Sequence, residues 1–518
     1  RYCKQPRRSG SVLCTVKFFQ PYQINIEISE SMENGFCYYV IVQYACLVRH
    51  KDSKIEDTMA QQLTIVMAQL NFLVGDIDGN TDLVIATARR AIAEQSADMI
   101  AFPELTLTGY PPEDLLLRPS LQVRVEKALA KILEADLDIF LVIGYPLRQE
   151  AKLYNALCVI KGKESLGTYF KQCLPNYQVF DEHRYFAPGT DPLLLEIMGT
   201  SCAFTICEDL WESGPIQQAK SAGAQLVVNI NASPFHINKL DERKKLLSQR
   251  CKQGNFPILY VNLIGGQDEL VFDGGSMAVN AEGECCFLAP SYIEDLCSLK
   301  ITANQDGSIE IPQQSIAGEL VLEADVYQSL VLGVRDYVNK NKFEGVVLGL
   351  SGGIDSALTL AIAVDALGSN RVEAVMMPFE YTSQLSLDVA AQQAKNLDVN
   401  YQVIAINDIY RSFIDALTEE FAGTEVDVSE QNIQARARGV LLMAISNKKG
   451  LLVLTTGNKS EIAVGYSTLY GDMAGGFDVL KDVSKTLVYK LADYRNNSFL
   501  QQREEVIPQQ VIDRAPSA

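Results

Sequence analysis

The chain has 518 residues, more than a single hydrophobic core usually accommodates, so at least two domains are expected. Apolar residues make up 47% of it and charged residues 21%, the composition of an ordinary soluble globular protein. The formal net charge is -19, with 64 acidic against 45 basic residues, and a surface of that sign repels phosphate backbones and anionic lipids. Nucleic acids and membranes are therefore not expected as partners.

The 12 cysteines and 3 histidines limit the chemistry that the chain can carry. No two cysteines have Cys-x-x-Cys spacing, so most are expected to be reduced, buried side chains in a cytoplasmic protein. With only His50, His183 and His236, zinc sites and catalysis by Ser-His or Cys-His pairs lack the necessary side chains.

Residues 1–60 differ in pattern from the rest and are predicted to be an extension outside the fold. Their apolar run at 36–48 is too short to span a membrane and lies too far from the start for a secretory signal. Met59 precedes a strand-like segment and has the character of a natural start. The extension is then either not natively translated or, alternatively, an organelle-targeting segment.

Residues 61–300 are predicted to form the first domain. Short β-rich apolar runs alternate there with stretches whose apolar residues recur every three to four positions, as in amphipathic helices. Lys161-Gly162-Lys163 predicts a hairpin turn. The predicted strands are 63–70, 99–105, 139–146, 153–160, 202–207, 226–232 and 258–264, and the predicted helices are 81–95 and 121–135.

Residues 301–320 are polar and contain Gly307, Pro312 and Gly318, which predicts a linker to a second domain at 321–518. In that domain strands and helices alternate regularly, which favours a doubly wound parallel sheet. The predicted helices are 321–339, 357–367, 387–397 and 432–446, and the predicted strands are 346–350, 372–377, 401–406 and 451–455.

A glycine-rich turn joins a buried strand of the second domain to a helix. It reads Gly349-Leu350-Ser351-Gly352-Gly353-Ile354-Asp355-Ser356. The glycines let the backbone approach a ligand, and the N–H groups, the serines and the helix N-terminus form a cradle for phosphate. No Gly-Lys-Ser/Thr follows, so it is not a Walker loop. Asp355 places a negative carboxylate among phosphates, which is favourable if the carboxylate holds Mg²⁺. The alternative, a tight structural turn, does not require Ser, Asp and Ser together.

This loop resembles the signature of the ATP pyrophosphatase group, enzymes that adenylate a substrate and release pyrophosphate. The motifs QNIQAR at 431–436, TTGNKSE at 455–461 and YGDMAGGF at 470–477 narrow the resemblance to the NAD synthetase family. The resemblance implies that the loop and Thr456 bind ATP. It also implies that Asn432 and Glu461 contact deamido-NAD, and that Asp355 and Glu461 bind Mg²⁺.

A second candidate site centres on Cys207, which follows a predicted strand and precedes Glu208-Asp209-Leu210-Trp211. A thiol at a strand end can point into a pocket, but it needs a partner to act as a thiolate. Because histidine is scarce, Glu104 and Lys171 are the available partners. A core cysteine is the usual alternative, which remains the preferred interpretation for Cys158 and Cys202.

This Glu–Lys–Cys set resembles the nitrilase family, whose αββα sandwich would include the strands of the first domain. The resemblance implies that Glu104 is the general base and Cys207 the nucleophile. It implies that Lys171 stabilises the thiolate and the tetrahedral intermediate. A cation at that position is expected to lower the thiol pKa and to offset developing oxyanion charge.

The same resemblance implies which side chains bind glutamine and leaves one carboxylate open. Glu182 either supports Lys171 or is an ordinary surface carboxylate. The implied glutamine-binding residues are Tyr177, Ser233 and Lys239.

Both motif sets, in this order, resemble the glutamine-dependent NAD synthetases from about residue 63 to the end. The resemblance implies a nitrilase-like αββα sandwich followed by a doubly wound, Rossmann-like domain. It implies that L-glutamine, ATP and deamido-NAD are substrates, that Mg²⁺ is the cofactor, and that the chain forms a homo-oligomer. Members of the family continue past the equivalent of Ala518 and supply a lysine to the acceptor site, so a C-terminal truncation is expected.

Two other functions remain open at this point. One is an amidotransferase of the same group that acts on another carboxylate or carbonyl, against which the 456–461 segment argues. The other is an ATP-binding or scaffold protein without turnover. The presence of all the implied reacting and metal-binding residues argues against the second, namely Glu104, Lys171, Cys207, Asp355 and Glu461.

Overall fold

The computed structural model of the chain describes residues 12–17, 23–28, 61–499 and 505–515. They belong to two compact units, one within Arg1–Asp57 and the other within Thr58–Ala518. In the first unit, β1 (Val12–Lys17) and β2 (Gln23–Ile28) pair antiparallel. The rest of the predicted extension 1–60 lies outside the described residues.

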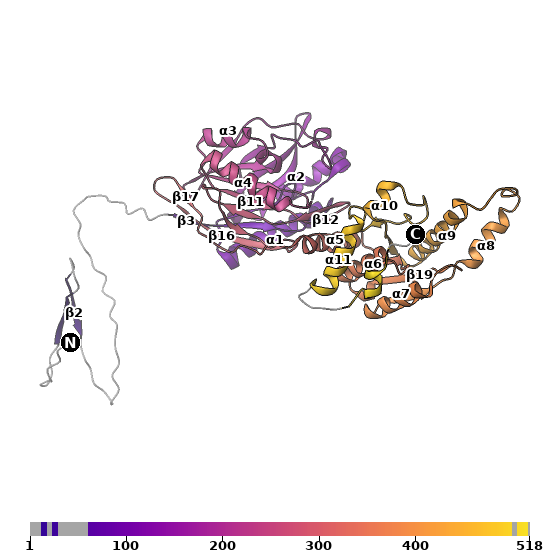
Figure 1. The fold of residues 1–518 in the computed structure, drawn as a ribbon. Helices are drawn as coiled ribbons and strands as arrows, with labels where there is room; N and C mark the ends of the chain where they lie inside the picture. The colour runs from indigo at the N-terminus through magenta and orange to yellow at the C-terminus, as the bar shows by residue number, and fades with distance from the viewer. Residues whose placement is uncertain (1–11, 18–22, 29–60, 500–504, 516–518) are drawn as a thin grey trace, which may run out of the picture. The chain divides into compact units, whose positions relative to one another are not determined.

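Two large mixed sheets form the first half of the second unit (Figure 1). The seven-stranded sheet runs in the order β17 (Ile309–Glu310), β16 (Asp295–Ala303), β3 (Gln61–Gln69), β4 (Met99–Ala101), β5 (Leu137–Gln149), β6 (Lys152–Gly162), β7 (Glu164–Phe170). The six-stranded sheet runs in the order β15 (Cys285–Leu288), β14 (Met277–Val279), β11 (Ile258–Asn262), β10 (Leu226–Asn231), β9 (Thr200–Ile206), β8 (Leu193–Ile197). A separate hairpin consists of β12 (Ile264–Gln267) and β13 (Leu270–Asp273).

Strand β3 shows how the sequence builds the layers, because successive side chains of a strand point to opposite faces. Leu63, Ile65 and Met67 lie in the core between the two sheets. Val66 and Ala68 lie in the outer core, which packs against helices α1 (Ile77–Gln95) and α2 (Pro119–Glu134). Helices α3 (Gly214–Ala222) and α4 (Lys239–Gly254) cover the outer face of the other sheet. The predicted αββα sandwich is confirmed.

The second half of the unit is a five-stranded sheet in which every pairing is parallel. Its order is β20 (Asn400–Val403), β19 (Val372–Met376), β18 (Gly345–Gly349), β21 (Leu451–Thr455), β22 (Phe477–Asp478). The helices are α5 (Leu322–Lys340), α6 (Ile354–Leu367), α7 (Gln384–Asn396), α8 (Asn407–Ala416), α9 (Val428–Lys449), α10 (Lys459–Val464), α11 (Lys485–Asn497) and α12 (Gln509–Asp513).

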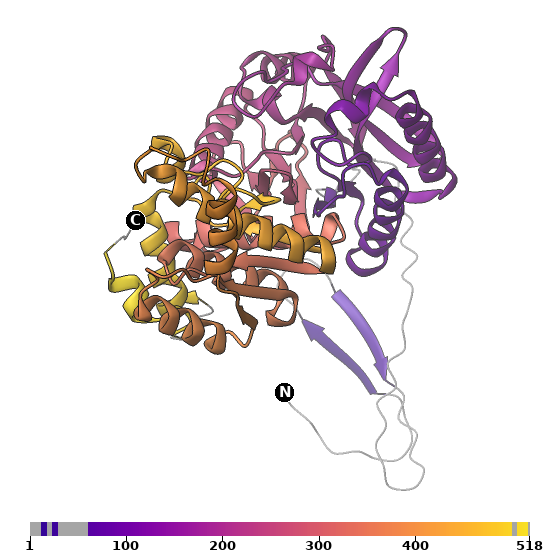
Figure 2. The same ribbon diagram turned by 90° about the vertical axis from the view of Figure 1, so that its right-hand side faces the viewer.

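Helices cover both faces of this sheet, as Figure 2 shows from a second side. Val346 and Leu348 of β18 lie in a core with α5, α6, α7 and α11, whereas Val347, between them, lies in a core with α9. The predicted doubly wound sheet is therefore confirmed. Chain order reverses between β18 and β21, and ligands of such sheets bind outside the carboxyl ends of the strands at this switch point.

Elements with a strong periodic pattern were predicted, and several without one were missed. The hairpin turn at Gly162 is confirmed, between β6 and β7. The short, partly exposed strand β8, the glycine-containing hairpin β12–β13 and the highly charged helix α4 were not predicted, because none shows a clear apolar period. Within the predicted linker 301–320, Ile301–Ala303 complete β16 and Ile309–Glu310 form β17.

Deletion of residues 1–58 is expected to leave the thermal midpoint, and the glutaminase activity that the family resemblance implies, nearly unchanged. Every core cluster of the described residues is built from Leu63 onward. Thermal unfolding of the shortened and full chains checks this. A drop of several degrees, about 1 kcal/mol or more in a protein of this size, would mean that the segment packs on the fold.

Candidate active sites

The backbone around Cys207 is held in a strained turn directly after β9. Cys207 begins a short 3-10 helix, and its φ is 42°, a left-handed conformation that non-glycine residues rarely adopt. Asp209, which is fully buried, fixes the turn. Its carboxylate accepts hydrogen bonds from the N–H groups of Ile206 (2.9 Å) and Cys173 (2.8 Å), and from the hydroxyl of Tyr169 (2.8 Å). This role of Asp209 could not be predicted from the sequence, in which Asp209 stands out only by its place in Cys-Glu-Asp-Leu.

A chain of buried charges lies beside the thiol. Nζ of Lys171 lies 2.7 Å from Oε1 of Glu104 and 2.8 Å from Oε1 of Glu182. Glu104 also accepts hydrogen bonds from Nδ2 of Asn155 (2.7 Å) and from the N–H of Ala232 (3.1 Å). Lys171 and Glu104 are each 1% exposed and Glu182 is 5% exposed. Glu182 is therefore a partner of Lys171, and the surface alternative is wrong.

Burial dominates the electrostatics of this cluster. It raises the pKa of the Cys207 thiol well above its usual value; Glu104 adds to the rise, and Lys171 opposes it. Lys171 thus acts in the expected direction but is outweighed, so the resting thiol is protonated at neutral pH. Burial also raises the pKa of Glu182, against the lowering effect of Lys171. A protonated nucleophile requires a base, and the carboxylate of Glu104 is one of the charges that act on it.

Glu182→Gln is expected to shift the alkylation of Cys207 to lower pH. Glu182 is one of the charges that raise the thiol pKa, so its removal stabilises the thiolate. The rate of iodoacetamide labelling of the Cys207 peptide, measured by mass spectrometry across a pH series, checks this. Lys171→Met should shift the curve to higher pH, because Lys171 lowers the same pKa. Equal curves for all three proteins would contradict the electrostatic account.

The three predicted glutamine-binding residues come from three different segments around the thiol. Ser233 follows β10, Lys239 begins α4, and Tyr177 lies in the loop after β7. The Tyr177 hydroxyl lies 3.0 Å from each carboxylate oxygen of Glu208, and Lys239 Nζ lies 4.2 Å above the ring of Trp211. A negative charge on the thiolate form of Cys207 would raise the pKa of both Tyr177 and Lys239, so both side chains are near the thiol.

The second candidate site is the phosphate loop between β18 and α6. Gly352 has a φ of 79°, and a side-chain carbon there would lie 2.5 Å from the carbonyl oxygen of Ser386, so only glycine fits. The Ser356 hydroxyl lies 3.0 Å from that of Ser351 and donates to the carbonyl of Gly353 (3.0 Å). The loop thus has the predicted compact form at the switch point of the sheet.

Two carboxylates meet beside this loop on one cation that the sequence did not single out. Lys485, at the start of α11, contacts Oδ2 of Asp355 and lies 3.5 Å from Oε1 of Glu461. Asn458 donates to Oδ1 of Asp355 at 2.9 Å. Nothing in the sequence distinguishes Lys485 from the other lysines, because its partners lie 130 and 24 positions away.

A cavity of about 760 Å³ opens between the loop and the segments that follow β21, a volume within the usual range for ligand sites. Asn432 does not line it; this side chain accepts a hydrogen bond from the hydroxyl of Thr468 (2.9 Å). Gly349 and Leu350 do not line it either: Gly349 is the last residue of β18, and Leu350 after it is buried. The predicted residues in its wall are Ser351, Gly352, Gly353, Ile354, Asp355, Ser356, Thr456 and Glu461.

The two carboxylates, Asp355 and Glu461, fit a magnesium ion whose other ligands come from a nucleotide and from water. No group of three or more His, Cys, Asp or Glu side chains converges within the described part of the chain. Asp355 and Glu461 converge on a single cation, Lys485. One or two carboxylates, completed by phosphate oxygens and water, are the usual protein ligands of Mg²⁺.

Known proteins match both halves of the chain. A carbon-nitrogen hydrolase family model matches residues 63–308, and an NAD synthase family model matches residues 326–518. Along the described residues, no helix is both long and apolar enough to cross a membrane.

Relatives extend over most of the chain. A glutamine-dependent NAD(+) synthetase of Acinetobacter baylyi is 47% identical over 88% of this chain and 83% of its own length. One of Aquifex aeolicus is 43% identical, with coverages of 88% and 84%. The solved structure of the Acinetobacter baumannii enzyme with ADP is 47% identical and superimposes with a TM-score of 0.84, covering 88% of this chain and 86% of that one. A Cytophaga hutchinsonii structure, 21% identical with a TM-score of 0.75 and coverages of 88% and 85%, shares the fold. The chain belongs to the family of glutamine-dependent NAD(+) synthetases.

Proposed function

We propose that the protein forms NAD from deamido-NAD, ATP and L-glutamine, with AMP, pyrophosphate and glutamate as the other products. The observation that carries the proposal is the presence, in one chain, of a buried thiol beside a Glu–Lys–Glu chain and of a phosphate loop at the switch point of a parallel sheet. The first site suits the hydrolysis of an amide. The second suits the activation of a carboxylate with ATP.

In the amide half-reaction, Glu104 takes the thiol proton of Cys207, whose sulfur attacks the carboxamide carbon of glutamine. Lys171 stabilises the negative oxygen of the tetrahedral intermediate. Ammonia leaves with the proton that Glu104 received, and a thioester remains. Water, activated by Glu104, then releases glutamate and restores the thiol. Tyr177, Ser233 and Lys239 hold the substrate, with Lys239 suited to a carboxylate.

In the second half-reaction, the nicotinate carboxylate attacks the α-phosphate of ATP, and pyrophosphate leaves. Ammonia then displaces AMP to give the amide. The loop residues from Gly349 to Ser356 and Thr456 bind ATP, and Asn432 and Glu461 contact deamido-NAD. Asp355 and Glu461 would hold Mg²⁺, which supplies positive charge against the phosphates. Lys485, already beside both carboxylates, is placed to contact the same phosphates.

Organisation and assembly are part of the same proposal. The glutaminase domain spans 61–310, because β16 and β17 carry its sheet past the predicted boundary at 300, and the linker is then 311–320. The synthetase domain spans 321–518. The eight described cysteines are all free, which supports a reducing, cytoplasmic location. Exposed apolar side chains on neighbouring segments support a homo-oligomer. Val440 of α9 is 63% exposed, and Tyr470, whose carbonyl lies against Gly439 of α9, is 76% exposed.

Glutamine labelled with ¹⁵N in its amide tests the proposal. Incubation with ATP, Mg²⁺ and deamido-NAD should give NAD carrying the label, with one AMP and one pyrophosphate per NAD, as read by mass spectrometry. A screen of other carboxylate acceptors separates the proposal from a related amidotransferase. Label that appears in another acceptor, or ADP in place of AMP, would refute it.

A further inference from the structure

Arg243 of α4 is fully buried in the sandwich and has no part in the proposed steps. Its Nη1 donates to both carboxylate oxygens of Asp273 at 2.8 Å. Its Nε donates to Oγ of Ser233 (3.2 Å), and its Nη2 donates to the carbonyls of Ser233 (2.7 Å) and Pro234 (3.2 Å). Burial of an ion pair has a large desolvation cost, so this pair is weak evidence for stability. The hydrogen bonds of Arg243 instead hold the Ser233–Pro234 segment in place.

A second buried side chain, that of Asn262, forms the remaining hydrogen bonds to Ser233. Asn262, at the end of β11, accepts a hydrogen bond from the N–H of Ser233 (2.9 Å) through Oδ1. Its Nδ2 donates to the carbonyl of Ser233 (3.3 Å) and to that of Gly274 (2.8 Å). The backbone N–H, the carbonyl and the hydroxyl of Ser233 are therefore each bonded to Arg243 or Asn262, and neither of those side chains is exposed.

Asp273 belongs to the β12–β13 hairpin, which is fastened to helix α5 of the second domain. In β12, the N–H of Gly266 donates to Oδ2 of Asp336 (2.7 Å), and the carbonyl of Gly266 accepts from Nζ of Lys340 (2.8 Å). A side-chain carbon at Gly266 would lie 3.1 Å from Cα of Gly333, so hairpin and helix are in close contact. The hairpin thus contacts the Ser233 segment through Asp273 and α5 through Gly266.

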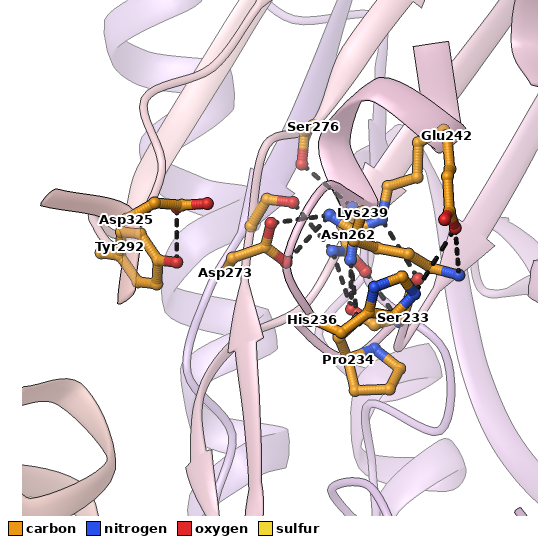
Figure 3. A network of polar contacts seen from close by, with 12 residues as sticks. Ser233, Pro234, His236, Lys239, Glu242, Asn262, Asp273, Ser276, Tyr292 and Asp325 are labelled. Atoms are coloured by element: carbon orange, nitrogen blue, oxygen red, sulfur yellow. Dashed lines mark hydrogen bonds and ion pairs between the residues drawn. The ribbon is translucent and has the colours of Figure 1, made fainter. Parts of the chain in front are cut away.

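Tyr292 makes a second connection between the same two places. Its N–H donates to the carbonyl of Asp273 (2.9 Å), and its hydroxyl donates to Oδ1 of Asp325 on α5 (2.7 Å). Figure 3 shows the Tyr292–Asp325 pair on one side of Asp273, with Asn262 and Ser233 on the other. The ring of Phe235, two residues after Ser233, lies 6.1 Å from that of Tyr292, and both pack with Leu332 of α5.

We propose that Arg243, Asp273 and Tyr292 are positioning residues of the glutamine pocket. Through their hydrogen bonds they hold Ser233 in its orientation, and they are themselves connected to helix α5 by the β12–β13 hairpin and Tyr292. The affinity for glutamine therefore depends on the contacts between the pocket and the second domain. This inference rests on the proposed role of Ser233 in glutamine binding. Among the described residues, the side chains of Glu104, Lys171 and Cys207 make no hydrogen bond to Arg243, Asp273 or Tyr292, and Glu104 meets this segment at the N–H of Ala232. We therefore expect a larger change in glutamine binding than in the chemical step.

The test compares the steady-state hydrolysis of glutamine by Tyr292→Phe, Asp325→Asn and Asp273→Asn. Asp273→Asn is expected to raise KM for glutamine about tenfold, which corresponds to roughly 1.4 kcal/mol. Tyr292→Phe and Asp325→Asn are each expected to raise it about threefold, with kcat nearly unchanged, and to have no added effect on each other in the double variant. NAD formation from ammonium should remain at the level of the unaltered chain in all of them.

Two comparisons separate positioning from a general loss of structure. Tyr327→Phe removes a similar hydroxyl–carboxylate bond within the second domain (2.5 Å, to Asp365) and should leave KM for glutamine unchanged. In a Ser233→Ala background, the effect of Tyr292→Phe on KM should disappear, because Tyr292 acts through Ser233. If Asp273→Asn fails to fold, the two milder variants still decide the matter.

Distinct results would overturn the inference and the function beneath it. An unchanged KM in both Tyr292→Phe and Asp325→Asn, with Ser233→Ala impaired, overturns the positioning role alone. So does a fall in kcat without a change in KM. If Ser233→Ala itself binds glutamine normally, both the positioning role and the proposed glutamine site are wrong.

Discussion

Cys207→Ala is expected to reduce glutamine-driven NAD formation by on the order of 10⁶-fold, the loss seen when the nucleophile of subtilisin is removed. Without the thiol no thioester can form. Cys202 and Cys158 are not expected to replace it, because the charges of Glu104 and Lys171 act on the pKa of Cys207, whereas burial is the main cause of the raised pKa of the other two. The measurement is the release of glutamate and of NAD with glutamine as the nitrogen source. Persistent use of glutamine by the variant would mean that the thiol site is wrongly assigned.

Ammonium salt at high concentration and mildly alkaline pH should restore NAD formation in Cys207→Ala. The synthetase site needs only ammonia, whatever its source. Glu104→Ala and Lys171→Ala should be rescued in the same way, since all three residues serve one half-reaction. Cys202→Ala is the matched control: it removes a fully buried thiol of β9 and should lower the thermal midpoint while sparing turnover. A folded variant that ammonium cannot rescue would contradict the division into two sites.

The sequence was most informative where a local pattern and a local structure coincide. The phosphate loop is a contiguous segment, and the strand before it is a continuous apolar run, so both the loop and its place at a strand end were predictable. The strands of the sandwich's centre, such as β9 and β10, are likewise apolar runs with buried side chains. Elements that take their stability from their neighbours, such as the β12–β13 hairpin, carry no such signal.

The candidate sites divide in the same way. A family pattern in the sequence predicted the reacting set of Glu104, Lys171 and Cys207. In the structure, Glu104 and Lys171 form an ion pair of 2.7 Å. The groups that complete the sites come from distant positions, as Glu182 and Lys485 show, and their roles depend on tertiary contacts alone. The direction in which the pKa of the Cys207 thiol is shifted could not be predicted from the sequence either, because it depends on how deeply the thiol is buried.

Asp355→Asn is expected to reduce pyrophosphate release about 10²-fold or more, as the loss of a transition-state contact does, while glutamine hydrolysis stays measurable. The change removes one of the two carboxylates that would hold Mg²⁺. It also frees Lys485 from a contact that sets its position beside the phosphate loop. Pyrophosphate and glutamate, measured in parallel on the same preparation, give the two rates.

Asp365→Asn is the control for this variant, because Asp365 is a carboxylate of the same helix, α6, with a purely structural setting. It accepts hydrogen bonds from Arg495 (2.6 and 3.0 Å) and from Tyr327 (2.5 Å), away from the cavity. Its loss should lower the thermal midpoint and leave pyrophosphate release per folded molecule unchanged. If Asp355→Asn retained normal ATP turnover, the metal assignment would be wrong. Asp355→Asn and Asp365→Asn could instead both lose pyrophosphate release, glutamine hydrolysis and expression yield together. Asp355 would then have a structural role, because the loss of its charge from α6 would act through folding and not through the phosphates.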